Sequence, residues 1–157
     1  VQSYPDYGVE RRGAPVVAFA RIAEPGDDLF VRQDIREPHH LLILDATLLD
    51  SANPIAGLQP GGWVVVNTSD PPSALGIVPR FRVATVNATE IAQRHGLGSA
   101  AQPVVNTAIL GAFVKATGIV SMEDLLAAID HEVPVKAEEN RLAASEAYEQ
   151  VLLEVSV

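Results

Sequence analysis

Cysteine is absent from this chain, and its absence excludes several kinds of site. Without thiols the chain can form no disulfide bond. It also cannot use its own thiolates to hold an iron–sulfur cluster or a structural zinc ion. If the protein takes part in electron transfer through such clusters, another chain must hold them.

Long hydrophobic runs and an excess of positive charge are also lacking. No apolar run approaches the ~20 residues of a membrane-spanning helix, and the first residues have neither the basic nor the apolar region of a signal peptide. We therefore expect a cytoplasmic protein that does not enter a membrane. The chain has 11 Lys and Arg against 20 Asp and Glu, a net charge of −9. Nucleic-acid binding needs a basic face, so this composition argues against it.

The familiar catalytic motifs are missing as well. The sequence contains no Gly-x-Ser-x-Gly, no His-Glu-x-x-His and no phosphate-binding P-loop. His39 and His40 are adjacent, and adjacent residues of a strand point to opposite faces, so the pair is a poor metal site. We expect neither a catalytic residue nor a metal ligand in this chain.

Three short aliphatic runs, at residues 40–45, 62–67 and 81–87, indicate the fold. Runs that are apolar almost throughout are typical of parallel strands covered on both faces by helices. The 157 residues, 48% of them apolar, suffice for one domain with a sizeable core. The predicted fold class is α/β, with an open, mostly parallel Rossmann-like sheet and helices on both of its faces.

Each aliphatic run ends in an Asp or Asn, which places Asp45, Asn67 and Asn87 along one rim of the sheet. Ligands of open α/β sheets bind at that rim. The alternative is that these side chains cap helices, and Asn87 with Glu90 does form the pattern of a capping box. Asn67 and Thr68 instead begin a polar, proline-rich loop, which makes them candidates for ligand binding.

The second half of the chain predicts three helices. The first, residues 103–117, is apolar almost all round, and we expect another subunit to cover part of it. Gly111 within it permits close approach of a second helix. Ser121 caps the next helix. The last helix, about residues 135–155, is amphipathic with a charged, solvated face.

Near the start of the chain, Arg11 and Arg12 precede a Gly13-Ala-Pro turn and then a strand-like run to residue 22. Planar, permanently charged guanidinium groups at the mouth of a sheet suit a phosphate or a carboxylate. The alternative is a solvated arginine pair before an edge strand. Residues 23–38 follow as a polar, extended segment, and one interpretation of it is a hairpin with residues 29–31 on its return limb.

Three blocks of the sequence resemble one known family. Residues 3–22 (SYPDYGVERRGAPVVAFARI), 106–129 and 139–150 are similar, in this order, to signatures of the gamma-type subunit of 2-oxoacid:ferredoxin oxidoreductases, which include pyruvate synthase. Ala147 stands where that family usually has glycine. The resemblance implies a single gamma-type domain over residues 1–157. The family also has an upstream strand and glycine-rich turn, so we expect the first βα unit to be missing here.

The resemblance also implies a function. Such complexes decarboxylate a 2-oxoacid on thiamine diphosphate and Mg²⁺, pass electrons through iron–sulfur clusters to ferredoxin, and transfer the acyl group to coenzyme A. Alpha-, beta- and delta-type partner subunits would hold the thiamine and the clusters. The gamma-type domain resembles a coenzyme A docking module, whose basic turn corresponds to Tyr7, Arg11, Arg12 and Gly13.

Two alternatives stay open. The chain could be a subunit of an aryl 2-oxoacid oxidoreductase of the indolepyruvate type, or a non-catalytic α/β nucleotide-binding module. On the family interpretation the isolated chain has no activity. The identity of the 2-oxoacid is not encoded in this chain, because its side chain is recognised near the thiamine.

Overall fold

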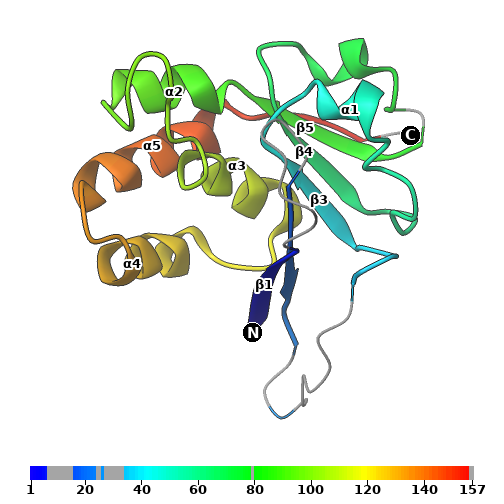
Figure 1. The fold of residues 1–157 in the computed structure, drawn as a ribbon, viewed down its shortest axis with the longest axis horizontal. Helices are drawn as coiled ribbons and strands as arrows, with labels where there is room; N and C mark the ends of the chain where they lie inside the picture. Colours follow the sequence, from blue (N-terminus) through cyan, green and yellow to red (C-terminus); the bar gives the residue numbers. More distant parts are fainter. Residues whose placement is uncertain (7–15, 24–25, 27–33, 79, 156–157) are drawn as a thin grey trace.

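The computed structural model of the chain describes residues 1–6, 16–23, 26, 34–78 and 80–155 (Figure 1). Tyr7, Arg11, Arg12 and Gly13 lie outside the described residues. Residues 29–31, the return limb of the hairpin interpretation, lie outside them too. The fold described below therefore tests the predicted sheet and helices but not the arginine turn.

The main sheet has four strands in the order β3-β4-β5-β6. The first three, β3 (His40–Ile43), β4 (Trp63–Asn67) and β5 (Arg82–Val86), are parallel, and β6 (Leu152–Glu154) runs antiparallel to β5. The three predicted strands and their parallel arrangement are thus confirmed.

Both faces of the sheet are covered, as the aliphatic runs require. Val65 of β4 packs into a core with α2 (Ala88–Arg94), α3 (Ala108–Thr117) and α5 (Ala137–Gln150). Val64 and Val66 point to the other face, where the short helices α1 (Leu48–Ser51) and η1 (Pro72–Leu75) lie. All three valines are fully buried, as alternation along a strand with two covered faces predicts.

The predicted helix caps are confirmed. The Asn87 side chain accepts a hydrogen bond from the backbone N–H of Glu90 at 3.1 Å, at the start of α2. Ser121 accepts one from the N–H of Asp124 at 3.0 Å, at the start of α4 (Met122–Glu132). Gly118, with φ of 65°, ends α3. These caps satisfy backbone N–H groups that would otherwise lack partners.

One prediction about α3 is corrected. The helix begins at Ala108 and not at residue 103, because Pro103 pairs with Gly98 in an isolated bridge and Val104 donates its N–H to the Leu97 carbonyl. The expectation that another subunit covers part of this helix stays a prediction, and Leu110 and Phe113 are only partly buried within the chain. None of its ten residues is exposed, because β4, β5, α2, α4 and α5 of the same chain pack around it.

The close approach predicted at Gly111 is confirmed. A Cβ atom at this position would lie 1.8 Å from the backbone oxygen of Ala144 in α5. The α3 and α5 backbones are therefore nearly in contact, and only glycine fits between them.

The final helix is shorter than predicted. It ends at Gln150, and the backbone becomes extended at Val151 and enters β6. The prediction of a helix to residue 155 is wrong because the short apolar run after Gln150 also fits a strand, and pairing with β5 decides between the two.

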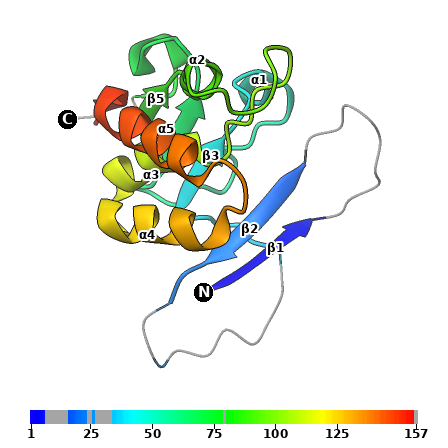
Figure 2. The ribbon, with the colours of Figure 1, turned by 90° about the vertical axis from the view of Figure 1, so that its left-hand side faces the viewer.

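A separate antiparallel ribbon precedes the sheet. It pairs β1 (Gln2–Asp6) with β2 (Val17–Arg21), and the rings of Tyr4 and Phe19 lie 5.5 Å apart across it. The strand predicted after residue 15 therefore exists, but it is not part of the parallel sheet. Figure 2 shows the ribbon extending beyond the body of the domain.

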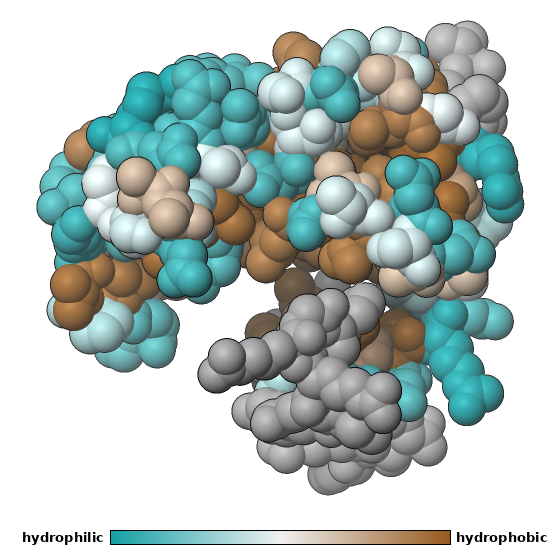
Figure 3. All heavy atoms as spheres, turned by 45° about the horizontal axis from the view of Figure 1, so that its top comes forward, coloured by the Kyte–Doolittle hydropathy of each residue, from teal (hydrophilic) through white to brown (hydrophobic). Residues whose placement is uncertain are grey.

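Charged residues gather on the outer surface of the helical layer. Arg94 of α2 forms ion pairs with Glu90 at 2.6 Å and with Glu146 of α5 at 2.5 Å. On the face shown in Figure 3, hydrophilic residues predominate at the upper left, whereas hydrophobic residues are frequent in the centre and toward the right. Among the described residues, no helix is both long enough and apolar enough to cross a membrane.

Candidate functional site

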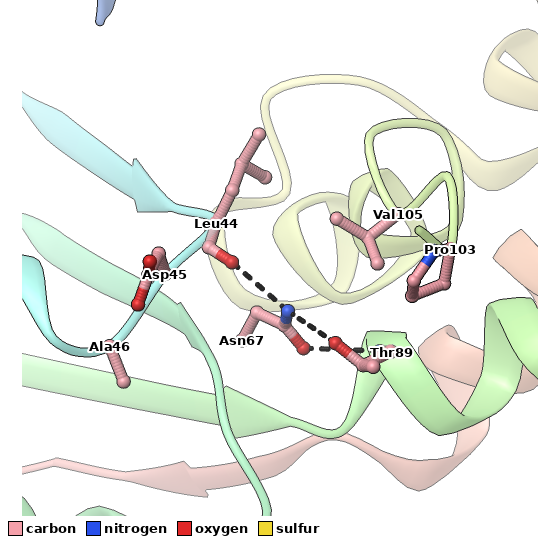
Figure 4. A pocket seen from close by; sticks show the side chains of 7 residues that line it. All are labelled: Leu44, Asp45, Ala46, Asn67, Thr89, Pro103 and Val105. Atoms are coloured by element: carbon pink, nitrogen blue, oxygen red, sulfur yellow. Dashed lines mark hydrogen bonds between the residues drawn. The ribbon is translucent and has the colours of Figure 1, made fainter. Parts of the chain in front are cut away.

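A pocket of about 400 Å³ lies at the carboxyl ends of β3 and β4. Its walls come from the end of each strand, from the first turn of α2 and from the loop before α3 (Figure 4). The described residues that line it are Leu44, Asp45, Ala46, Asn67, Thr89, Pro103 and Val105. The pocket therefore occupies the rim at which open α/β sheets bind ligands.

Asn67 forms hydrogen bonds that join three elements beside this pocket. Its Nδ2 donates to the Leu44 carbonyl at 3.0 Å and to the Thr89 hydroxyl oxygen at 2.9 Å, and its Oδ1 accepts the Thr89 backbone N–H at 3.2 Å. These bonds join the end of β3, the end of β4 and the first turn of α2. Asn67 thus shapes the pocket as well as lining it.

Asp45 supplies the negative charge of the pocket. Its Oδ1 accepts the backbone N–H of Thr47 at 3.0 Å and the Thr47 hydroxyl at 2.7 Å. These two hydrogen bonds stabilise the carboxylate and lower the pKa of Asp45 below its ordinary value of 3.8. Asp45 is therefore ionised at neutral pH and is a weak base, which does not favour a role in proton transfer.

The other predicted rim residues do not reach this pocket. Thr68 donates its backbone N–H to Val86 at 3.0 Å and accepts the Asp70 N–H on its hydroxyl at 3.1 Å, so it forms the turn after β4. Asn87 caps α2. His40, at the opposite end of β3, accepts the Trp63 N–H on its Nδ1 at 3.2 Å, a structural role.

Sequence reasoning missed several residues of the pocket. Thr89 lies inside the capping box that begins at Asn87, and that pattern could have drawn attention to it. Pro103 and Val105 carry no such signal. They reach the rim because the bridge between Gly98 and Pro103 folds the loop back.

The lining suits a neutral polar ligand. Among the described residues that line the pocket none is basic, and the polar groups are one carboxylate, one amide, one hydroxyl and backbone groups. Phosphate binding would need cations from elsewhere, such as Arg11 and Arg12, which lie outside the described residues.

Comparison with known proteins decides the family. A family model described as pyruvate ferredoxin/flavodoxin oxidoreductase matches residues 1–150. The chain belongs to this family. The resemblance to gamma-type subunits of 2-oxoacid:ferredoxin oxidoreductases is thereby confirmed.

Relatives within the pyruvate ferredoxin/flavodoxin oxidoreductase family cover nearly the whole chain. Pyruvate synthase subunit PorC of Methanocaldococcus jannaschii is 43% identical over 152 residues, which span 96% of this chain and 80% of that protein. The pyruvate/ketoisovalerate oxidoreductases common subunit gamma of Pyrococcus furiosus is 42% identical over 156 residues, again 96% and 80% of the two chains.

The fold agrees with that of a solved family member. The crystal structure of pyruvate oxidoreductase subunit PORC from Thermotoga maritima matches with a TM-score of 0.76 and 30% identity. The match covers 97% of this chain and 80% of the Thermotoga chain. The predicted α/β class is confirmed.

Replacing Asn67 with alanine is expected to lower the free energy of unfolding by about 2 kcal/mol, because three hydrogen bonds, two of them half-buried, are lost together. Urea denaturation followed by circular dichroism measures the change. As a control, Asn106→Ala removes an exposed asparagine and should lower the free energy of unfolding by less than about 0.5 kcal/mol. Equal stability of the two variants would show that the hydrogen bonds of Asn67 do not contribute to the stability of the domain.

Proposed function

We propose that this chain is the gamma-type subunit of a thiamine diphosphate-dependent 2-oxoacid:ferredoxin oxidoreductase complex, in which it docks coenzyme A and contributes to subunit assembly. The names of the relatives support the subunit assignment, since they are called a pyruvate synthase subunit and a common subunit gamma. Pyruvate, or a 2-oxoacid close to it, is the substrate of the complex on this proposal.

The pocket at the rim is the observation that carries the docking role. It lies where ligands of parallel α/β sheets bind, and its volume is within the range of small-molecule sites. Coenzyme A is long and carries its negative charges at one end. The described lining fits an uncharged part of such a molecule, while Arg11 and Arg12 would bind the phosphates. Tyr7 and Gly13 belong to the same predicted sequence motif as these arginines, and Thr68 follows Asn67 next to the pocket.

Coenzyme A supplies the thiol that accepts the acyl group, so this chain contributes by binding and orienting that substrate. Thiamine diphosphate, Mg²⁺ and the iron–sulfur clusters belong to alpha-, beta- and delta-type partners on this proposal, with ferredoxin as the electron acceptor. The absence of cysteine from this chain is consistent with that division.

The relative from Pyrococcus furiosus supports a role that does not depend on the 2-oxoacid. Its name describes it as a subunit common to pyruvate and ketoisovalerate oxidoreductases. A subunit shared by two enzymes cannot select between their substrates by itself. Docking of coenzyme A is a step that both reactions would share.

Cross-linking tests the docking role directly. The assembled complex is irradiated with coenzyme A that carries a photoreactive group on its sulfur, and the labelled peptides are identified by mass spectrometry. We expect label on this subunit, near residues 7–13, 44–46 or 103–105, and we expect excess unmodified coenzyme A to suppress it. Suppressible label confined to the other subunits would contradict the proposal.

A further inference from the structure

We propose that the rim pocket binds the pantetheine arm of coenzyme A, and that the Asp45 carboxylate accepts hydrogen bonds from the amide or hydroxyl groups of that arm. This inference rests on the proposed docking function. It adds a specific residue, a specific part of the ligand and a direction for the bound molecule.

The Asp45 carboxylate has one oxygen engaged and one available. Oδ1 is held by the backbone and the hydroxyl of Thr47. Among the described residues, none donates a hydrogen bond to Oδ2, and Asp45 forms no ion pair with a described Lys, Arg or His. Thr47 therefore fixes the carboxylate and leaves Oδ2 as an ionised acceptor on an exposed residue that lines the pocket.

The remaining polar groups make the pocket rich in acceptors. Both hydrogens of the Asn67 amide are used, by Leu44 and by Thr89, which leaves only acceptor capacity on its Oδ1. The Thr89 hydroxyl already accepts from Asn67 and keeps its own hydrogen as a donor. A ligand that brings N–H and O–H donors satisfies this lining, whereas a ligand that brings negative charge meets the Asp45 carboxylate.

Coenzyme A has one segment with these properties. The pantetheine arm is uncharged and offers two amide N–H groups and a hydroxyl, separated by short apolar pieces that could pack on Leu44, Pro103 and Val105. The other end of the molecule carries a diphosphate and a 3′-phosphate, which the carboxylate would repel. Asp45 would thus orient coenzyme A with its phosphates directed away from this pocket.

Equilibrium binding to the assembled complex, with no 2-oxoacid present, tests this orientation. Coenzyme A is titrated by calorimetry, and binding of pantetheine and of adenosine 3′,5′-bisphosphate is measured by ligand-observed NMR. For Asp45→Ala we expect about tenfold weaker binding of both coenzyme A and pantetheine, the scale of one lost charge-assisted hydrogen bond. Binding of the bisphosphate should not weaken.

Two further variants make the result specific. Asp45→Asn can still accept the Thr47 hydrogen bonds but has no charge, so it should weaken pantetheine binding less than Asp45→Ala does. Asp50→Asn removes another exposed carboxylate, in α1, and should change none of the affinities. Unchanged pantetheine binding in Asp45→Ala, or weakening that affects the bisphosphate instead, overturns the inference.

The same titrations separate this inference from the docking proposal. If only the pantetheine assignment is wrong, Arg11→Ala and Arg12→Ala still weaken coenzyme A binding while Asp45→Ala does not. If coenzyme A docks on another subunit, neither the arginine variants nor the Asp45 variants change its affinity, and the photoreactive analogue labels that other subunit.

Discussion

Gly111→Ala is expected to destabilise the domain by about 3 kcal/mol or more, or to prevent folding altogether. The added methyl group would lie 1.8 Å from the Ala144 carbonyl oxygen and 2.7 Å from its carbonyl carbon. Both atoms belong to the α5 backbone, so no side-chain rotation can relieve the clash. The α3 and α5 helices would have to separate, at the upper end of the cost of overpacking a core. Urea denaturation of the purified protein measures the effect.

Two control variants distinguish this clash from a general effect of removing glycine. Gly118→Ala places a methyl group in open space but at φ of 65°, which should cost about 1 to 2 kcal/mol. Combining Gly111→Ala with Ala144→Gly should restore nothing, because trimming the Ala144 side chain leaves its carbonyl in place. If Gly111→Ala costs no more than Gly118→Ala, the close approach of the two helices is not important for stability.

Arg11→Ala and Arg12→Ala are each expected to raise the Michaelis constant for coenzyme A by about ten- to hundredfold in the assembled enzyme. Coenzyme A brings several phosphate charges toward a chain with a net charge of −9, so local cations must offset a repulsive long-range field. The loss of one charge-assisted contact costs roughly 1.5 to 3 kcal/mol, which corresponds to that range. We expect the larger effect for Arg12, on the hypothesis that Glu10 orients Arg11.

The effect should be confined to the step that uses coenzyme A. Steady-state kinetics with varied coenzyme A measure its Michaelis constant. The half-reaction with the 2-oxoacid alone should proceed at the wild-type rate in both variants. Arg36→Ala, at an exposed arginine, should change neither. A half-reaction slowed as much as acyl transfer would instead indicate that the arginines hold two subunits together.

The sequence predicted those features that depend on neighbouring residues. The aliphatic runs indicated three parallel strands, because strands with two covered faces need apolar residues on both sides. The caps at Asn87 and Ser121 follow from hydrogen bonds across three residues. The end of α3 at Gly118 follows from the left-handed conformation that glycine adopts readily.

The candidate site could be predicted only in outline. Alternation and strand ends placed Asp45 and Asn67 at one rim, and both line the pocket. The partners of Asn67 were not predictable, since Leu44 and Thr89 are more than twenty residues away from it in the chain. Pro103 and Val105 enter the pocket through a loop held by the bridge between Gly98 and Pro103 and by further hydrogen bonds, such as that from the Val104 N–H to the Leu97 carbonyl.

By itself, then, the sequence determined the parallel strands, the helix caps, the position of close helix contact and the family to which the chain belongs. Only the tertiary structure decided that α5 covers α3, so that most of this apolar helix is buried within its own chain. It also decided that the residues after Gln150 form β6 beside β5. The physical reason is that local patterns specify which face of a segment avoids water, whereas contacts between distant segments specify what covers that face.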